Sequence, residues 1–381
     1  MLKICHFVSY YLPVTQNWIY SQLIHNKECE AAVLCQRLVN PKQFPFDNVH
    51  PICQSSGLGS IPKRLTHKIF ERYPFKPHAS VIEKFKPDIF HGHFLLESWR
   101  NYRIVKKFNI PLVTTCYGQD ITSLPRKPFW AARCKKVFEL SRAFIVEGEH
   151  MAGTLVDLGC PREKIDIIKL GIDTAKLTPQ TVEGNNVRPP DAANKIKILF
   201  TGLNREKKGA VYAVKAFIKA LSITNADLEL HLLGDGIYRE PMEKILTDAG
   251  VRQKVIFHGM RSISEYHKIL GGTDLLLAPS IHATDGDTEG GAPVVVIEAL
   301  CAGVPVVGSK HCDIPNIVSH GSSGLLSDER DVDALARDIC ILSENPPLRI
   351  GMGASGAKYA RAEHDIAKQA RKIADVYRAC L

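Results

Sequence analysis

The chain has 381 residues, of which 45% are hydrophobic and 23% are charged. This composition is typical of a folded globular protein and excludes disordered and fibrous chains, and the length accommodates two α/β domains. No stretch approaches the roughly 18 apolar residues that a membrane-spanning helix needs, and Leu2–Val8 is typical of a strand rather than of a signal peptide. We therefore expect a cytoplasmic protein, peripheral on the inner face of the cell membrane if it binds a membrane at all.

The net charge of +9 belongs to one half of the chain. Residues 1–190 hold 26 Lys and Arg against 16 Asp and Glu, whereas residues 191–381 hold 23 against 24. The segment 126–142 interleaves basic with aromatic and apolar residues, a pattern that suits an anionic membrane surface and, equally, a solvated helix face. No zinc finger, RNP-type motif or basic repeat accompanies the charge, so we expect no nucleic-acid partner.

Short β-branched apolar runs alternate with amphipathic segments along the whole chain, which predicts parallel sheets built from βαβ units. The expected strands of the first half are 3–8, 32–35, 89–91, 112–115 and 143–146. The expected strands of the second half are 196–201, 228–233, 255–258, 275–279 and 304–308. The segment 178–194 is rich in Pro, Asn, Gly and Asp and is the expected linker.

The predicted fold class is therefore α/β, with two Rossmann-like parallel-sheet domains facing a cleft. We expect an N-terminal domain of residues 1–180 and a C-terminal domain of residues 195–362. A final helix, residues 363–381, is expected to cross back to the first domain. Because ligands in open α/β sheets bind at the carboxyl ends of the strands, the loops that follow the strands are the expected functional regions.

In the first half, three such loops carry polar or aromatic side chains. The loop after the first strand holds Thr15, Gln16, Asn17 and Trp18, where Trp18 either stacks on a bound ligand or belongs to the core. His91 and His93 end the strand 89–91 and serve either as hydrogen-bonding groups or as structural caps. No third ligand follows at a useful spacing, so we expect no metal.

The third loop, residues 116–121, contains Tyr117 and Asp120. A phenol such as that of Tyr117 can hydrogen-bond a ligand hydroxyl. Asp120 either orients a ligand or fixes the loop.

In the second half, the strand 196–201 opens into Gly202, followed by Arg205 and Lys208, and then by a helical segment, residues 210–221. A glycine turn beside two cations and a helix N-terminus can neutralise a diphosphate without metal, although a solvated charged turn explains the same residues. The turn at Gly234 is equally compatible with a plain tight turn.

The most informative segment is residues 284–300, an acidic, glycine-rich loop that leads into an apolar helix. The backbone amides of Gly290, Gly291 and Ala292 are expected to bind phosphate or sugar oxygens. The helix that follows is expected to begin at Pro293 and Val294, and its N-terminus adds to the same site. Glu298 interrupts the apolar face of that helix, and a buried carboxylate needs a hydrogen-bonding partner such as a ribose diol.

These segments, together with residues 171–173, 302–307, 314–318 and 320–326 in the same order, resemble the family-4 retaining glycosyltransferases with the GT-B fold. The resemblance implies a nucleotide-sugar donor in the second domain, an acceptor in the first, and no metal or other cofactor. It implies that Lys208 contacts donor phosphates, Glu298 the ribose, and Glu289 the donor sugar. Residues 12–20 are similar to the exopolysaccharide branch that makes colanic acid and amylovoran.

Four departures from the family pattern bear on the site, one of which is Asn316, where the family often has Glu. Glu289 and Glu298 are nine positions apart where the family has eight. Either Glu289 or Gly290 therefore matches the family's first glutamate, which contacts the donor sugar. Leu203 stands where the family has arginine, with Arg205 two residues later, and Tyr117 stands where a histidine meets the reacting sugar.

We therefore expect a retaining, metal-independent transferase that moves a sugar to a saccharide or lipid-linked oligosaccharide in cell-surface polysaccharide synthesis. Glu289, Tyr117, His93 and Asp120 are the expected catalytic group. A nucleotide-sugar 2-epimerase and a non-catalytic binding relative remain open as alternatives. A nicotinamide-dependent oxidoreductase is disfavoured, because residues 9–13 after the first strand lack the Gly-x-Gly-x-x-Gly fingerprint.

Overall fold

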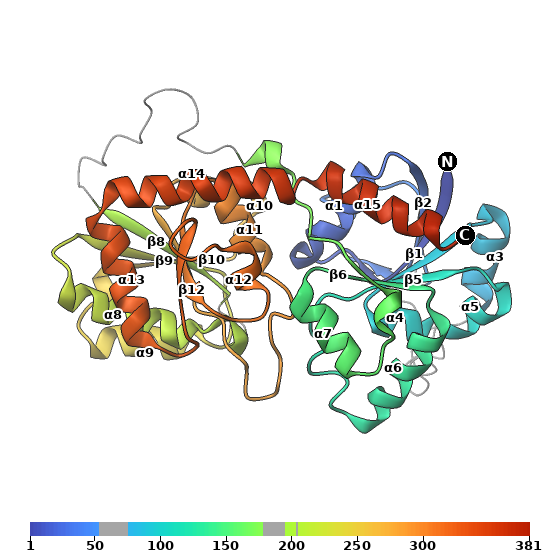
Figure 1. The fold of residues 1–381 in the computed structure, drawn as a ribbon, viewed down its shortest axis with the longest axis horizontal. Coiled ribbons are helices and arrows are strands. Elements are labelled where there is room, and N and C mark those ends of the chain that lie inside the picture. The colour runs from blue at the N-terminus through green and yellow to red at the C-terminus, as the bar shows by residue number, and fades with distance from the viewer. Residues whose placement is uncertain (53–74, 178–194, 203–204) are drawn as a thin grey trace. The chain divides into compact units, whose positions relative to one another are not determined.

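The computed structural model describes residues 1–52, 75–177, 195–202 and 205–381 (Figure 1). The chain divides into two compact units: Met1–Gly171 with Ile366–Leu381, and Ile172–Asp365. The expected linker 178–194 and Leu203 lie outside the described residues.

The first unit is built on a seven-stranded sheet in the order β3-β2-β1-β4-β5-β6-β7, and all of its neighbouring strands are parallel. Its strands are β1 (Leu2–Tyr11), β2 (Cys29–Leu38), β3 (Val49–Pro51), β4 (Ile89–His93), β5 (Leu112–Thr115), β6 (Ala143–Val146) and β7 (Ile165–Ile167). The central strands β4, β5 and β6 are buried along their whole length, as expected for a parallel sheet covered on both faces.

The helices of the first unit are α1 (Asn17–His25), α3 (Phe75–Phe85), α4 (Leu95–Arg100), α5 (Tyr102–Phe108), α6 (Pro128–Leu140), α7 (Glu149–Asp157) and α15 (Ile366–Ala379), with 3-10 turns at Val14–Gln16 and Arg162–Lys164. The last helix, α15, belongs to this unit although it ends the chain (Figure 1). Its Ile373 and Tyr377 pack with Ile4, Val113 and Ile145 of the sheet in one buried cluster.

The second unit is built on a six-stranded parallel sheet in the order β10-β9-β8-β11-β12-β13. Its strands are β8 (Ile196–Thr201), β9 (Leu228–Leu233), β10 (Val255–Gly259), β11 (Leu275–Ala278), β12 (Val306–Ser309) and β13 (Gly324–Ser327). Its helices are α8 (Ala210–Ile223), α9 (Arg239–Asp248), α10 (Ile263–Gly271), α11 (Val294–Cys301), α12 (Ile314–Ile317), α13 (Val332–Glu344) and α14 (Pro346–Glu363), with 3-10 turns at Thr174–Lys176, Glu206–Lys208 and Arg252–Lys254. The apolar face of α8, with Val214 and Phe217, packs on Ile198 and Phe200 of β8 in the core of this unit.

Each sheet reverses its strand order once, and this reversal places the candidate site residues. The reversal falls between β1 and β4 in the first sheet and between β8 and β11 in the second. Ligands in open α/β sheets bind beside the carboxyl ends of the strands at such a switch point. The loops after β1, β4, β8 and β11 are the loops in which the sequence places most of its candidate residues.

The two parallel-sheet, Rossmann-like units confirm the predicted fold class, and all ten expected strands are present. Three further strands, β3, β7 and β13, were not expected from the sequence. The expected C-terminal helix, residues 363–381, is present as α15 (Ile366–Ala379) and belongs to the first unit. Among the described residues, no helix is long and apolar enough to span a membrane.

Candidate functional site

The site in the second unit begins where β8 ends, at Gly202. This residue has a φ of 119°, and a Cβ atom placed on it would come within 2.5 Å of Lys208 Cγ. Glycine therefore serves two purposes here: it adopts a backbone conformation that other residues avoid, and it leaves room for the Lys208 side chain to pass.

The 3-10 turn Glu206–Lys208 is tied to the loop that follows β11. Glu206 Oε2 accepts hydrogen bonds from the backbone N–H and the hydroxyl of Thr284, at 3.1 and 2.7 Å. Lys207 Nζ donates to Asp287 Oδ1 at 3.2 Å and to the Thr288 carbonyl at 2.7 Å. The Lys207 side chain is mostly buried, so its charge is neutralised within the protein and it holds the two loops together.

Lys208, the next residue, forms an ion pair with Glu289. Its Nζ lies 3.0 Å from the carboxylate, which also accepts a hydrogen bond from Ser280 Oγ at 2.9 Å. Burial raises the pKa of Glu289, but the charges of Lys208 and Lys207 and the bond to Ser280 outweigh it, so the pKa lies below its ordinary value. The Glu289 side chain is therefore a fixed negative charge at neutral pH.

Glu298 lies on α11, and its partner is a tyrosine that the sequence interpretation missed. Tyr266, on α10, donates its hydroxyl hydrogen bond to Glu298 Oε2 at 2.7 Å. The other oxygen, Oε1, lies 4.0 Å from His267 Nε2, beyond hydrogen-bonding distance. Burial, followed by the Glu298 carboxylate, raises the pKa of Tyr266 well above its ordinary value, so the phenol stays protonated and donates.

The glycine-rich loop before α11 differs in two details from expectation. The Gly290 backbone N–H donates to Thr288 Oγ1 at 3.1 Å, so this amide is engaged within the loop rather than available for a ligand. Pro293 has extended backbone angles and precedes the helix, which begins at Val294, whereas a first-turn position was expected. Gly291 and Ala292 are buried between these two points.

Arg205 and Gly234 lie at the ends of β8 and β9, beside this loop system. Arg205 is exposed and precedes the 3-10 turn, whose Lys208 N–H donates to the Arg205 carbonyl. Gly234 has a φ of 106° and donates its N–H to the Gly259 carbonyl at 3.0 Å. Arg205 is thus a solvent-facing cation and Gly234 forms a turn joined to β10.

In the first unit, Tyr117 and His93 form part of a buried relay of hydrogen bonds. The Tyr117 hydroxyl lies 2.8 Å from His93 Nδ1, and His93 Nε2 lies 3.0 Å from His6 Nδ1. His93 is completely buried, so it has no direct contact with solvent and is joined to Tyr117 by this hydrogen bond. His6, which the sequence interpretation missed, comes from β1.

The three histidines His6, His91 and His93 are close enough to be considered as metal ligands. His91, however, already uses both ring nitrogens, with Tyr377 Oη at 2.6 Å and Thr115 Oγ1 at 2.7 Å. Burial lowers the pKa of His6 to about 3 and those of His91 and His93 well below the ordinary value. The group is accordingly a neutral hydrogen-bond network.

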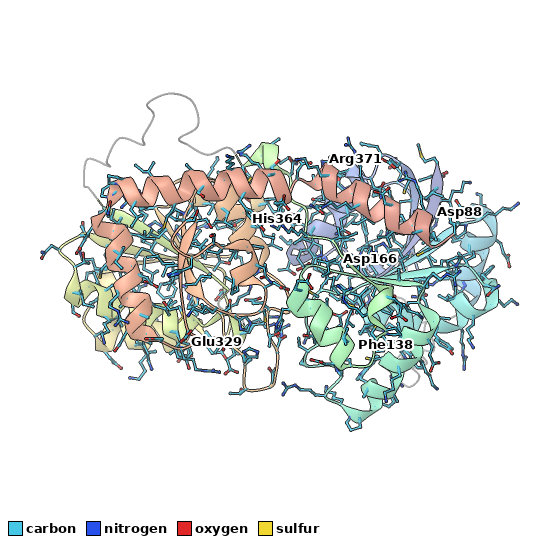
Figure 2. All side chains as sticks on the ribbon, viewed as in Figure 1. Asp88, Phe138, Asp166, Glu329, His364 and Arg371 are labelled. Carbon is cyan, nitrogen blue, oxygen red and sulfur yellow. The ribbon has the colours of Figure 1, made fainter. Side chains whose placement is uncertain are left out.

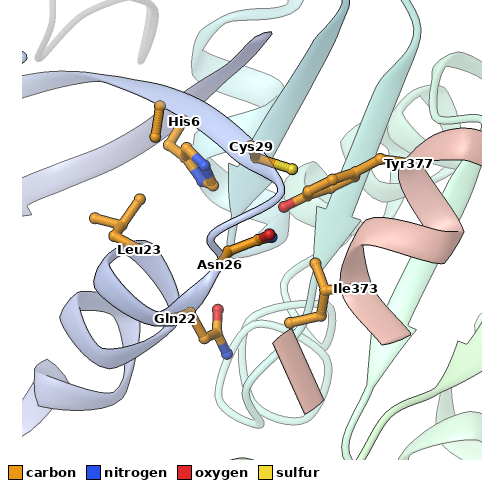
Figure 3. A pocket seen from close by; sticks show the side chains of 8 residues that line it. His6, Gln22, Leu23, Asn26, Cys29, Ile373 and Tyr377 are labelled. Carbon is orange, nitrogen blue, oxygen red and sulfur yellow. The ribbon is translucent and has the colours of Figure 1, made fainter. Parts of the chain in front are cut away.

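The relay ends at a small pocket in the first unit, lined by His6, Gln22, Asn26 and Tyr377 among others (Figure 3). Among the described residues, the buried Asn26 Oδ1 has no hydrogen-bond partner, so a water in this pocket has a polar group to bind.

Asp120 fixes the loop after β5. Its Oδ1 accepts the Tyr117 N–H at 3.1 Å and its Oδ2 accepts the Leu95 N–H at 3.0 Å, at the start of α4. Burial raises the pKa of Asp120, and the backbone N–H groups oppose that rise. Both carboxylate oxygens are therefore occupied by backbone groups, and the side chain orients Tyr117.

The residues after β1 lie beside Tyr117. Thr15 and Gln16 belong to a 3-10 turn, and Asn17 begins α1. The ring of Trp18 is half-buried against the core cluster and lies 5.7 Å from the ring of Tyr117. Trp18 therefore has a packing role, and Thr15 is the exposed member of the group.

Comparisons with known proteins agree with this geometry. Residues 27–176 match the family described as Glycosyltransferase Family 4, and residues 185–359 match the family described as Glycosyl transferases group 1. Each half of the chain thus matches a glycosyltransferase family, with a family 4 domain followed by a group 1 domain.

Three relatives illustrate the similarity. WcaL of Escherichia coli K12, named as a colanic acid biosynthesis glycosyltransferase, is 26% identical over 79% of this chain and 73% of its own length. AmsK of Erwinia amylovora, an amylovoran biosynthesis glycosyltransferase, is 29% identical over 70% of this chain and 64% of its own length. The crystal structure of Anabaena HepE in complex with UDP and glucose matches all of both chains with a TM-score of 0.76 at 17% identity, which shows a shared fold.

Proposed function

We propose that this protein transfers a sugar from a nucleotide-sugar donor to a saccharide or lipid-linked oligosaccharide in exopolysaccharide synthesis, with retention of anomeric configuration and without metal. The observation that carries the proposal is the Lys208–Glu289 ion pair at the switch point of the second sheet. It places one cation and one fixed carboxylate next to each other, as needed by a ligand that combines a diphosphate with sugar hydroxyls. The naming of WcaL and AmsK supports the polysaccharide context.

On this proposal, the donor is held in three parts by the second unit. The diphosphate lies against Lys208, with Arg205 as the second cation. The ribose hydroxyls donate to Glu298 Oε1, the carboxylate oxygen that Tyr266 does not use. The sugar hydroxyls donate to Glu289, which is ionised and accepts hydrogen bonds only.

Lys208 then has a changing role during the reaction. Before the donor binds, its charge is balanced by Glu289. A diphosphate competes with Glu289 for the same ammonium group. Because the diphosphate gains negative charge as the sugar departs, its interaction with Lys208 strengthens as the reaction proceeds. This is stabilisation of the transition state by a preorganised charge, a role that other enzymes give to a metal ion.

Retention is supported by the state of Asp120. An inverting reaction requires a general base that removes the acceptor proton, and Asp120 is the carboxylate that the sequence offered for this purpose. Both of its oxygens accept backbone N–H groups, which leaves it poorly suited to act as a base. A substitution on the same face of the sugar, in which the leaving phosphate takes the proton, needs no such group. Tyr117 then serves the acceptor as a hydrogen-bonding group.

The membrane part of the proposal concerns α6. Lys135 and Lys136 are exposed on this helix, and Phe129 at its start is 56% exposed. Arg133 is different, because its guanidinium stacks on the rings of Phe129 and Trp130. We therefore assign contact with anionic lipid headgroups to the lysines and Phe129, and a packing role to Arg133.

Product analysis tests the transfer reaction and its stereochemistry. The protein is incubated with a nucleotide sugar and an acceptor in the presence of EDTA, and the anomeric proton of the product is followed by NMR from the first turnover. Release of nucleoside diphosphate with formation of the retained anomer is the expected result. A changed sugar without any acceptor product would favour the epimerase, and tight donor binding without turnover would favour a non-catalytic relative.

A further inference from the structure

Behind Glu289 lies a second layer of side chains that the proposed donor contacts do not use. The Glu289 backbone N–H donates a hydrogen bond to His311 Nε2 at 3.1 Å. His311 follows β12, and its side chain is completely buried. On its other side, His311 Nδ1 lies 2.6 Å from Glu329 Oε1, in the loop after β13; Glu329 is labelled in Figure 2.

The positions of the protons in this series of hydrogen bonds follow from the identity of the donors. A backbone N–H can only donate, so His311 Nε2 must be the unprotonated nitrogen. The neutral ring then carries its proton on Nδ1, which donates to the Glu329 carboxylate. Glu329 Oε2 in turn accepts the backbone N–H of His282, which follows β11, at 2.9 Å. One carboxylate thus connects three loops at the carboxyl ends of the sheet.

We propose that His311 and Glu329 are positioning residues that hold the Glu289 backbone, and with it the Glu289 carboxylate, in place for the donor sugar. The proposal rests on the proposed function and deepens it at the sugar end of the donor. Neither residue touches the donor; each acts through Glu289. His282, Glu329 and His311 are also close enough to be weighed as metal ligands, but a metal on His311 Nδ1 would move the ring proton to Nε2, against the Glu289 N–H.

The arrangement depends on His311 remaining neutral. The groups that face its ring are the carboxylates of Glu329 and Glu289, the imidazole of His282 and the thiol of Cys312, which lies 3.1 Å from Nε2. Burial lowers the pKa of His311 below its ordinary value, and the bond to Glu329 and the two carboxylate charges only partly oppose that change. Below this pKa, Nε2 gains a proton and two donors face each other, so the Glu289 hydrogen bond is lost.

Two substitutions at His311 separate positioning from simple packing. His311→Gln places an amide oxygen near the position of Nε2, where it can accept the Glu289 N–H, and this group does not titrate. His311→Leu fills space but accepts nothing. His320→Gln is the matched control, because His320 Nδ1 accepts the backbone N–H of Leu326 elsewhere in the same unit.

The first measurement needs no substrate: deuterium uptake of the Glu289 amide, followed by mass spectrometry of the full chain. We expect faster exchange in His311→Leu than in wild type by about tenfold or more, and near wild-type exchange in His311→Gln and His320→Gln. Equal protection of Glu289 in wild type and His311→Leu, in proteins with the same melting temperature, would overturn the proposal. This result is independent of whether any nucleotide sugar is a substrate.

The second measurement is the pH dependence of donor turnover. In wild type, kcat/KM for the donor should fall as the pH decreases below 6.5. His311→Gln should retain activity and should not show this part of the fall, because its side chain does not titrate. The affinity for the nucleoside diphosphate alone should be unchanged within about twofold in all variants, since Lys208 and Glu298 are intact. An unaltered acid limb in an active His311→Gln enzyme, or equal losses in His311→Gln and His311→Leu, would contradict the positioning role. Inactive wild type that binds no nucleotide sugar would instead remove the proposed function.

Discussion

Lys208 and Glu289 are 81 positions apart in the chain, and their side chains form an ion pair at 3.0 Å in the second unit. The approach is possible because Gly202 leaves space for the Lys208 side chain. In addition, Glu206 and Lys207 hydrogen-bond to the loop after β11 and so hold it against the loop after β8. The pair therefore combines a conformationally fixed acid with a cation that, on our proposal, exchanges this partner for a donor phosphate.

The first prediction concerns Lys208. Lys208→Ala removes the proposed phosphate contact and leaves the buried Glu289 carboxylate without its ion-pair partner, facing the diphosphate. We expect the affinity for the donor to fall by about tenfold to a hundredfold, measured by calorimetry. Lys254→Ala, which breaks the Lys254–Asp227 ion pair in the same unit, is the control and should leave affinity unchanged. Similar donor affinity in both variants would remove Lys208 from the site.

The second prediction concerns Glu298 and Tyr266. Glu298→Gln reduces the ability of the side chain to accept from a ribose and from the Tyr266 hydroxyl at the same time. We expect weaker binding of nucleoside diphosphate by about tenfold, and a smaller loss in Tyr266→Phe, which frees Oε2 without removing the carboxylate. A deoxyribose analogue that binds wild type as well as the ribose form does would argue against the assigned ribose contact.

The third prediction concerns Tyr117. Tyr117→Phe keeps the ring that packs beside Trp18 and Phe94 but removes the hydroxyl that meets His93. Donor binding should be unchanged, whereas kcat for transfer should fall by about tenfold or more. Initial-rate kinetics with varied acceptor, together with donor calorimetry, measures both quantities. A loss of donor affinity with normal kcat would place Tyr117 outside the acceptor side.

The fourth prediction concerns the buried histidines of the first unit. The pKa values of His6, His91 and His93 are lowered in the folded protein, to about 3 for His6, while the unfolded chain titrates near 6.5. Their contribution to the free energy of unfolding is therefore complete above pH 6.5 and decreases as the pH falls toward the folded pKa, by up to about 1.4 kcal/mol per pH unit for each group.

NMR of the imidazole carbon-bound protons provides the check. The three buried rings should show constant chemical shifts from pH 8 to pH 5. A full titration of His93 near pH 6.5 in the folded protein would contradict the neutral network.

The fifth prediction concerns α6 and membranes. Lys135→Ala with Lys136→Ala should weaken sedimentation with vesicles that contain anionic lipid, and added salt should weaken the wild type in the same way. Lys215→Ala with Lys219→Ala, on α8 of the second unit, removes equal charge and should have little effect. Unchanged binding in the α6 variant would end the membrane part of the proposal.

The sequence predicted the central strands well because buried parallel strands are continuous apolar runs. Ile196–Thr201 and Leu112–Thr115, for example, agree with β8 and β5 in both bounds. The three strands that were missed, β3, β7 and β13, are short and lie at the ends of their sheets. An end strand has one strand neighbour and a short apolar run, so its pattern differs little from that of a loop.

For the candidate site, the sequence identified residue types but not their pairing. Lys208 and Glu289 were both singled out, yet their ion pair depends on the adjacency of β8 and β11, which no local spacing encodes. His6 was overlooked inside an apolar strand, because only ligands that follow His91 and His93 were considered and His6 precedes them by more than 80 residues. His311 follows the carboxyl end of β12, so the rule that drew attention to the other loops would have found it.

The most direct test of the central claim is binding of a panel of UDP-, GDP-, ADP- and dTDP-sugars to the purified protein in EDTA, followed by thermal shift and calorimetry. We predict saturable binding of one nucleotide sugar, with affinity lost in Lys208→Ala and Glu298→Gln and retained in Lys254→Ala. Failure of every donor to bind a folded wild-type protein, with or without added divalent metal, would contradict the assignment of a nucleotide-sugar site to the second unit.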